Sequence, residues 1–139
     1  MMADVFDKQK RSAIMAAVKG KNTKAELIVF RYLRYHKVYF QKHYRRVPGS
    51  PDLALPRKKK AVFIDGDFWH GRTYDDLLAK HGADSFWPTK IGGNVKRDEE
   101  QRARLLDGGW QICQVWVSDL NRLSTRQEAL EKIRAFLTS

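Results

Sequence analysis

Two carboxylates at the ends of neighbouring predicted strands are the first residues whose types and spacing could do chemistry. Asp52 opens one predicted strand directly after Pro51, and Asp65 closes the next, an unbroken apolar run that starts at Ala61. If the strands pair as a hairpin, both carboxylates lie at one edge of the sheet, where their oxygens suit Mg²⁺. A divalent ion held there can polarise a phosphodiester and help to form the attacking hydroxide. The alternative is that each Asp only caps a turn, since Pro-Asp is a common turn dipeptide.

A histidine and a glutamate are candidate partners of these carboxylates. His70 follows Asp65 by five residues, and an imidazole with an ordinary pKa of about 6.5 suits the removal of a proton from water. A lone histidine is more often structural, but two carboxylates so close in the sequence favour a catalytic role. Glu26 fits a capping box with Thr23. It also lies one helical turn before Phe30, at the edge of the predicted buried face, and can point toward the same end of the sheet.

Large apolar side chains near the candidate site have two interpretations. Beside a metal site they can belong to the core, which is the simpler reading of each one taken alone. They can also be wedges that enter a base stack, where unstacking costs a few kcal/mol per step. A mismatched pair lowers that cost, so wedging would select damaged DNA. The candidates are Met15, Phe68 and Trp69.

The charge of the chain indicates a polyanion partner. Its 139 residues include 27 Lys and Arg against 16 Asp and Glu, which gives a formal net charge of +11. The partner is then nucleic acid or an anionic membrane surface, unless the protein is merely soluble or ribosome-like. The membrane alternative is weak because the basic residues are spread over the chain and no long amphipathic basic helix is evident.

Several basic clusters flank the candidate site in the sequence. Runs of this kind are usually solvated faces, but their position here fits contacts with DNA phosphates. The basic residues that we assign to DNA binding are Arg11, Lys19 and Lys21. Further clusters lie at residues 45–46 and 57–60.

Cysteine usage and hydropathy place the protein in the cytoplasm. Cys113 is the single cysteine, so no internal disulfide and no Cys-based zinc cluster can form. No stretch approaches the roughly 20 apolar residues of a membrane helix, and the N-terminus lacks the apolar core of a signal peptide. We therefore expect a cytoplasmic protein with no membrane partner.

The predicted elements describe one α/β domain over residues 1–139, a mixed central sheet flanked by helices. Residues 1–10 are expected to be a mobile arm. Strands are predicted at 38–41, 52–55, 61–65 and 110–116, with a hairpin tip at 57–60. The strand at 61–65 should be central because an unbroken apolar run indicates burial on both faces. Helices are predicted at 12–18 and 24–36, from an Asn94 cap to 107, and after a second capping box made by Ser124 and Gln127.

Five stretches, taken in order, carry a family resemblance. They are MADVFDKQKRSAIMAAVKGKNTKAE, PGSPDLAL, VFIDGDFWHG, FWPTKIGGNVKRDEEQRARLLDGGW and VWVSDL. Each alone is weak, but the set is specific and covers nearly the whole chain up to about Leu120. On these stretches the chain resembles the very short patch repair endonucleases, the Vsr family.

The resemblance implies a restriction-endonuclease-like fold with a reduced PD-(D/E)XK core. The implied activity is Mg²⁺-dependent nicking of double-stranded DNA 5′ to the T of a T·G mismatch. Such mismatches arise when 5-methylcytosine deaminates, and the family usually acts beside a cytosine methyltransferase. A cytosine methyltransferase context and mismatch-repair proteins are thus expected around the protein, which should act as a monomer.

The resemblance also implies roles for individual residues. Matched by motif, Asp52 is the central metal-binding carboxylate, and the backbone carbonyl of Ile64 is the second metal ligand, where family members often carry Thr. His70 takes the position of the water-activating histidine, and Glu26 that of a supporting acidic residue. Asp65 stands where the best-known members have a histidine, and it could bind metal more directly or act as an acid/base partner. The family's intercalating residues fall at Met15, Phe68 and Trp69.

A structural zinc is a family feature that this chain departs from. The best-known members bind that zinc through Cys and His. The corresponding places here are Asp67, Arg72 and Tyr74, which cannot rebuild such a site. We therefore expect no structural zinc, and we expect the region to be held by packing around Trp69, Phe86 and Trp87.

Two other functions remain as alternatives to mismatch nicking. The same fold supports restriction or less specific DNA cleavage, and the sequence does not expose the side chains that read bases. A non-catalytic nucleic-acid-binding module is the other alternative. Asp52, Asp65 and His70 together argue against that module, because a pure phosphate binder gains nothing from carboxylates at its binding surface.

Overall fold

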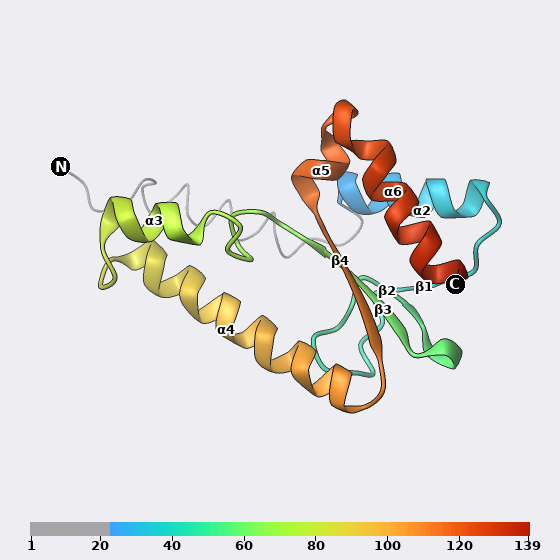
Figure 1. Cartoon of the computed structure of the whole chain (residues 1–139), viewed down its shortest axis with the longest axis horizontal. Helices are drawn as coiled ribbons and strands as arrows, with labels where there is room; N and C mark the ends of the chain where they lie inside the picture. The colour runs from blue at the N-terminus through green and yellow to red at the C-terminus, as the bar shows by residue number, and fades with distance from the viewer. Residues whose placement is uncertain (1–22) are drawn as a thin grey trace.

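A four-stranded mixed sheet forms the centre of the molecule (Figure 1). The computed structural model describes residues 23–139, and the structural statements below concern that part of the chain. The strands are β1 (Gln41–Lys42), β2 (Leu53–Leu55), β3 (Lys60–Asp65) and β4 (Gln111–Trp116), in this order across the sheet. The β1–β2 and β2–β3 pairs are antiparallel, whereas β3 and β4 are parallel. The predicted α/β class with a mixed sheet is confirmed.

β3 is the strand that the sequence describes best. All six of its residues are buried, as its unbroken apolar run predicts. The predicted hairpin tip joins it to β2 through η1 (Pro56–Lys58), and Lys59 follows in the left-handed conformation with φ 51°. The parallel pairing with β4 requires a long crossover, which residues 66–110 supply. Because β2 and β3 are antiparallel neighbours, the start of β2 and the end of β3 lie side by side at one end of the strands.

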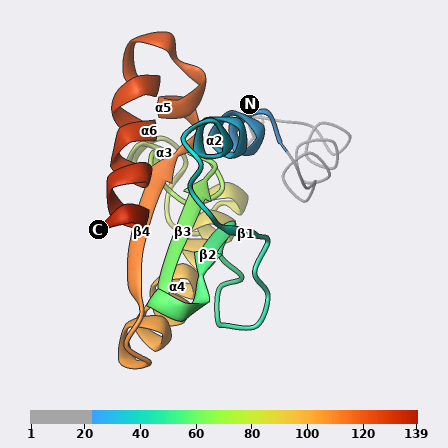
Figure 2. The ribbon, with the colours of Figure 1, turned by 90° about the vertical axis from the view of Figure 1, so that its right-hand side faces the viewer.

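Helices cover both faces of the sheet (Figures 1 and 2). One face packs against α2 (Lys24–Tyr35), α5 (Val117–Asn121) and α6 (Leu123–Thr138). The other face packs against the last turns of α4 (Phe86–Asp107), where Leu105 enters a second core. Successive side chains of a strand point to opposite faces, so β3 contributes to both cores.

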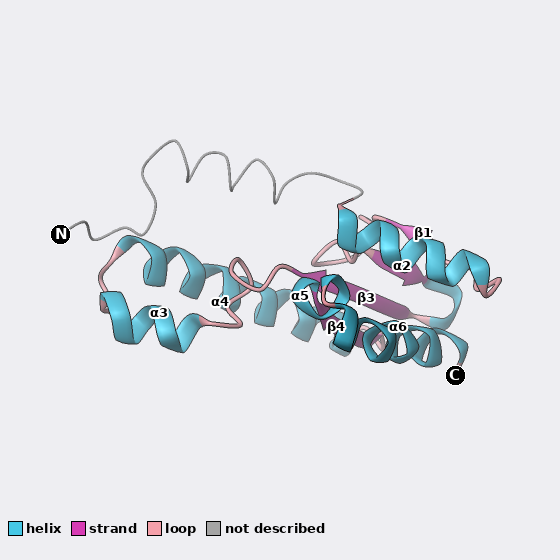
Figure 3. Cartoon of the chain, turned by 90° about the horizontal axis from the view of Figure 1, so that it is seen from above, coloured by secondary structure: helices cyan, strands magenta, loops and turns pink. Residues whose placement is uncertain are grey.

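The crossover carries a two-helix arm that extends beyond the sheet (Figure 3). α3 (Tyr74–His81) packs there against the first half of α4. Gly92 permits this close approach, since a Cβ at that position would lie 3.1 Å from the hydroxyl oxygen of Tyr74. The arm has a small core of its own, made of Trp69, Leu77, Trp87 and Ile91. No element is predicted from the sequence for most of this region, because small and polar residues interrupt its periodicity.

The first described helix begins as predicted. Thr23 Oγ1 accepts a hydrogen bond from the backbone N–H of Glu26 at 3.3 Å, and Glu26 Oε1 accepts one from the backbone N–H of Thr23 at 3.0 Å. This reciprocal pair is a capping box. α2 ends at Tyr35, one residue short of the prediction. The strand predicted at 38–41 lies instead at Gln41–Lys42.

The predicted start of α4 at an Asn94 cap is wrong. The helix begins at Phe86, with Ser85 at the N-cap position. Pro88 fits because it lies in the first turn, where the missing backbone donor is not needed. Asn94 is inside the helix, and its side-chain amide donates to the carbonyl of Trp69 at 3.0 Å. Tertiary contact therefore carries the helix through Gly92 and Gly93, each of which costs about 1 kcal/mol relative to Ala.

The second predicted capping box is also wrong. α5 ends at Asn121, and α6 begins almost at once at Leu123, with Arg122 at the N-cap position and no side-chain cap. Ser124 thus lies inside the first turn of α6 and cannot cap it. Within residues 23–139, no helix combines the length and the apolar character needed to cross a membrane.

Candidate active site

A cleft of about 530 Å³ opens where β2 begins and β3 ends. Its walls come from the start of α2, the loop before β2, the end of β3 and the middle of α4. The predicted site residues that line it are Glu26, Asp52, Ile64, Asp65 and His70. The fold therefore brings together candidates that lie up to 44 positions apart in the sequence.

Asp52 is held against β3 and is largely removed from water. Its Oδ2 accepts a hydrogen bond of 2.6 Å from the backbone N–H of Ile64. Burial raises the pKa of Asp52 to about 7, and the carboxylates of Glu26 and Asp65 act in the same direction, while the Ile64 hydrogen bond opposes them. A cation bound beside Asp52 would reverse this balance and favour the ionised carboxylate.

Glu26 places an unsatisfied oxygen in the same part of the cleft. The residue is 5% exposed, and its Oε1 is used in the capping box with Thr23. Its Oε2 is buried and has no hydrogen-bond partner. A buried polar atom without a partner costs about 1–3 kcal/mol, and more when it is charged. Glu26 thus combines its cap with a free acceptor that suits a cation.

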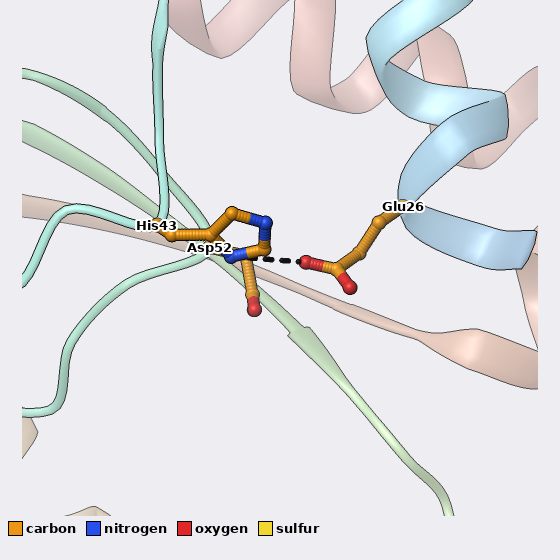
Figure 4. A group of neighbouring side chains, drawn as sticks. All are labelled: Glu26, His43 and Asp52. Carbon is orange, nitrogen blue, oxygen red and sulfur yellow. Dashed lines mark ion pairs between the residues drawn. The ribbon is translucent and has the colours of Figure 1, made fainter. Parts of the chain in front are cut away.

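His43 is a cleft residue that the sequence interpretation missed (Figure 4). Its Nδ1 lies 3.5 Å from Glu26 Oε2, and one potential ligand atom from each of Glu26, His43 and Asp52 falls within 4.8 Å of the others. The loop 44–51 separates His43 from Asp52 along the chain, yet the backbone N–H of His43 donates to the carbonyl of Asp52 at 2.8 Å. The Pro and Gly residues of that loop are typical of a turn, and they were the feature of the sequence that could have indicated that the chain folds back to bring His43 beside Asp52. Two carboxylates and an imidazole fit a divalent ion.

His70 forms a pair with Asp98, an α4 residue that the sequence did not single out. Asp98 Oδ2 lies 2.5 Å from His70 Nδ1. Burial of the imidazole disfavours its charged form, but the Asp98 hydrogen bond and the charges of Asp65 and Asp98 outweigh burial and raise the pKa of His70. If Nδ1 donates to Asp98, Nε2 is the nitrogen that accepts a proton.

Asp65 lies in the cleft wall, with its carboxylate already neutralised by the protein. Arg102 Nη2 contacts its two oxygens at 2.9 and 2.8 Å, and Gln114 Nε2 donates to Oδ2 at 3.2 Å. The Arg102 guanidinium also lies over the ring of Phe63, 4.2 Å from its centroid. His70 Nδ1 is 3.8 Å from Asp65 Oδ1. Both predicted roles of Asp65, as metal ligand or acid/base partner, therefore compete with its pairing to Arg102.

Comparison with known proteins assigns the chain to a family. Residues 3–76 match the family described as DNA mismatch endonuclease Vsr. The chain belongs to the Vsr family. Members of that family are DNA endonucleases, and this coarse assignment holds for the chain.

Similar proteins in bacteria agree with the family match. The chain is 37% identical over 122 residues to the type II nicking enzyme V.HpaIIP of Haemophilus parainfluenzae, across 86% of this chain and 85% of that protein. It is 31% identical over 132 residues to the type II nicking enzyme V.NmeAIP of Neisseria meningitidis, across 95% and 94%. It is 33% identical over 115 residues to the DNA mismatch endonuclease Vsr of Escherichia coli, across 83% and 74%.

Two of the predicted wedge residues of this Vsr-family chain belong to the arm, Trp69 in its core and Phe68 packed against that core. Trp69 is 7% exposed, and its ring lies 5.7 Å from that of Trp87 and 5.4 Å from that of Phe68. Phe86 packs edge-on against Trp87 at 4.8 Å. The packing expected around Trp69, Phe86 and Trp87 is confirmed. Insertion of Phe68 or Trp69 into DNA stays a prediction, and it would require Trp69 to leave this cluster.

Asp67 and Arg72, two positions at which the resemblance led us to expect no zinc ligand, belong to a polar network. Asp67 accepts hydrogen bonds from the backbone N–H of Ser118 at 2.9 Å and from Arg72 Nη1 at 3.0 Å. Burial raises the pKa of Asp67, but the bonds from Ser118 and Arg72 outweigh it, and the net shift is downward. Arg72 also contacts Asp119 at 3.4 Å. This network fastens the segment after β3 to α5.

Some predicted DNA-binding residues of this Vsr-family chain lie outside the described residues. They are Arg11, Met15, Lys19 and Lys21, together with the predicted helix at 12–18 and the arm at 1–10. Within the described part, Lys24, Arg45 and Arg102 are the basic residues that line the cleft, and Arg102 is paired with Asp65.

Proposed function

We propose that this protein nicks double-stranded DNA 5′ to the T of T·G mismatches that arise from deamination of 5-methylcytosine. The observation that carries the proposal is the single cleft in which Asp52, Glu26 and the His70–Asp98 pair meet, in a chain of the Vsr family. One relative is named a DNA mismatch endonuclease, and others are named nicking enzymes. We also propose a restriction-endonuclease-like fold, which the carboxylates at the ends of β2 and β3 support.

The metal in this proposal is Mg²⁺, held by Asp52 and by the backbone carbonyl of Ile64. The unsatisfied Oε2 of Glu26 and the raised pKa of Asp52 both indicate that the cleft suits a cation. When bound, such an ion neutralises charge on the phosphodiester and lowers the pKa of water. Asp52 is fixed for this task by its hydrogen bond to the Ile64 N–H.

His70 is the proposed general base. Asp98 holds its Nδ1, so that Nε2 takes the proton of the attacking water. Asp98 also stabilises the imidazolium that results, as an orienting carboxylate does for other catalytic histidines. The negative charge of Asp65, whose Oδ1 lies 3.8 Å from His70 Nδ1, also favours the imidazolium. Glu26 adds a carboxylate beside Asp52.

DNA binding in this proposal combines phosphate contacts with disruption of the base stack. Lys24 and Arg45 line the cleft and contact the phosphates that flank the nick. Arg11, Lys19 and Lys21 add phosphate contacts. Met15, Phe68 and Trp69 open the stack at the mismatch, where unstacking is easiest. A methyltransferase that produces 5-methylcytosine supplies the biological context.

The test is a nicking assay on matched duplexes. Wild-type protein with Mg²⁺ is incubated with duplexes of one sequence that carry T·G, T·A or C·G at one position, and any nick is mapped to the nucleotide. We expect a nick on the T strand, 5′ to the mismatched T, and no cleavage of the paired duplexes. Equal cleavage of all three duplexes would refute mismatch specificity.

A second candidate is restriction-like nicking at a recognised sequence. The names of five relatives as type II nicking enzymes favour it as an alternative. The same duplex panel in several flanking sequences separates it from mismatch recognition, because it predicts cleavage of paired DNA. Binding that ignores Mg²⁺, with no cleavage of any duplex, would instead identify a non-catalytic DNA-binding module.

A further inference from the structure

We propose that His43 is a direct ligand of the divalent ion, so that Glu26, His43 and Asp52 form a site that prefers Mn²⁺ to Mg²⁺. This inference deepens the proposed function and rests on it for the role of the ion in cleavage. It differs from the ligand set predicted above, which contained only Asp52 and the Ile64 carbonyl. His43 changes the site from oxygen ligands alone to a mixed nitrogen and oxygen set.

The spacing of the three side chains fits one coordination sphere (Figure 4). Two ligand atoms that each lie about 2.1 Å from an ion are separated by about 3.0 Å when adjacent and about 4.2 Å when opposite. The separation of His43 Nδ1 and Glu26 Oε2 is 3.5 Å, and all three donors lie within 4.8 Å of one another. The 3.5 Å separation lies between these two spacings, and the 4.8 Å limit exceeds the larger one by about 0.6 Å, so movement of the side chains on that scale brings the three donors onto one ion.

Glu26 supplies an independent indication that a cation belongs here. Its side chain is only 6% exposed, and Oε2 has no hydrogen-bond partner. The 3.5 Å to His43 Nδ1 exceeds the usual length of an N–H···O hydrogen bond, about 2.7–3.2 Å. Oε2 faces the two other donors. A shared ion satisfies this oxygen, whereas a direct bond from His43 does not in this geometry.

The backbone holds His43 firmly in place beside the carboxylates. Its N–H donates to the Asp52 carbonyl at 2.8 Å, and its ring packs edge-on against Phe30, with centroids 6.0 Å apart. His43 also has a φ of 49°, a left-handed conformation that is sterically unfavourable for residues other than Gly. Strained residues of this kind cluster at functional sites, where the fold fixes a side chain in one position.

The chemistry of the donor set selects the class of ion. Mg²⁺ prefers oxygen ligands and gives up its water reluctantly. An imidazole ligand suits first-row transition ions, and two carboxylates keep Mn²⁺ within the range of the site. Mn²⁺ thus gains from the His43 nitrogen, while Mg²⁺ gains little.

The experiment measures metal binding by the full-length chain without DNA. Titration calorimetry gives the Kd of Mn²⁺ and of Mg²⁺ for wild type, His43→Gln and the matched control His36→Gln, which lies outside the cleft. We expect wild type and control to bind Mn²⁺ at least about tenfold more tightly than Mg²⁺. We expect His43→Gln to lose about tenfold in Mn²⁺ affinity and less than about threefold in Mg²⁺ affinity.

Pulsed electron paramagnetic resonance of the Mn²⁺ complex tests the ligand directly. A ¹⁴N coupling should be present in wild type and in His70→Gln, and absent in His43→Gln. Equal affinity of wild type for the two ions, equal loss of both in His43→Gln, or a ¹⁴N coupling that survives that substitution would overturn the proposal. If His43→Gln fails to fold by circular dichroism, the wild-type affinity ratio together with the coupling in His70→Gln still decides it.

Nicking activity is scored separately from metal binding. Mn²⁺ preference with the His43 coupling but no cleavage of any duplex would refute the proposed function and leave the metal site standing. Cleavage of T·G duplexes without that preference and coupling would refute the metal site and leave the proposed function standing.

Discussion

Two buried carboxylates in the same cleft are treated in opposite ways by the protein. Asp65 is 2% exposed and has Arg102 and Gln114 as internal partners. Asp52 has one backbone hydrogen bond and two carboxylates near it, and its pKa rises to about 7. The difference indicates that Asp52, and not Asp65, needs a cation from outside the protein. Identical residue types at the ends of paired strands therefore serve different purposes, because Arg102 reaches only one of them.

The largest expected effect comes from removing the carboxylate that lacks an internal cation. In Asp52→Ala, nicking of T·G duplexes should fall by roughly a thousandfold, since several kcal/mol of charge stabilisation is lost. Binding of the mismatched duplex should persist. The nicking assay measures cleavage, and a gel-shift titration measures binding of the duplex. Nicking by Asp52→Ala at the wild-type rate would show that the assignment of Asp52 as a metal ligand is wrong.

The raised pKa of Asp52 should make the metal-free protein less stable as pH rises. The folded pKa of about 7 exceeds the ordinary value of 3.8, so the folded state binds the proton more tightly. The protonated Asp52 side chain favours the folded state, and this contribution is fully present below about pH 4 and is lost as pH rises to about 7. The free energy of unfolding falls over this range by an amount on the order of 4 kcal/mol at most. Urea unfolding in EDTA at several pH values measures this.

Asp52→Asn is the matched control for that pH dependence. Its unfolding free energy should lack the decline between about pH 4 and pH 7 that the wild type shows. Excess Mg²⁺ or Mn²⁺ should also remove much of the decline, because an ion stabilises the ionised carboxylate. Parallel curves for wild type and Asp52→Asn would contradict the pKa shift.

Removing the ion pair between Arg102 and Asp65 should mainly lower the stability of the protein. Arg102→Met leaves Asp65 buried without its cation, and the free energy of unfolding should fall by about 3 kcal/mol. Urea unfolding at pH 7 gives the change. Arg134→Met is the control, because its ion pair with Glu131 is exposed and should contribute less than about 1 kcal/mol. Equal losses of unfolding free energy in the two variants would show that the buried Arg102–Asp65 pair contributes no more to stability than an exposed pair.

The smallest expected effect concerns Asp98. The pKa of His70 is raised in the wild type, and a base must be neutral, so nicking should fall as pH drops through a value above 6.5. Asp98→Asn should move this decline to lower pH and reduce the maximal rate by about tenfold. Single-turnover rates between pH 5.5 and 8.5 test it. An unshifted profile would separate Asp98 from the base.

Local sequence signals predicted those parts of the fold that local physics controls. The apolar run of β3, the capping box of Thr23 and Glu26 and the hairpin tip before β3 are all found in the structure. The start of α4 and the Ser124 cap were wrong, because packing of the arm and the abrupt junction with α5 override local preference. The arm itself was missed, since its periodicity is broken by Gly92 and Gly93.

In the candidate site, too, some residues could be predicted from local sequence and others could not. The sequence alone determined which residues could do chemistry around β2 and β3, since Asp52, Asp65 and His70 stand next to recognisable strands. Only the tertiary structure decided their partners. His43, Asp98 and Arg102 come from a loop and a helix distant in the chain, and no local pattern marks them. Hydrogen bonds and charge pairing act through space, so the difference between a carboxylate that is neutralised and one that awaits a cation appears only after folding.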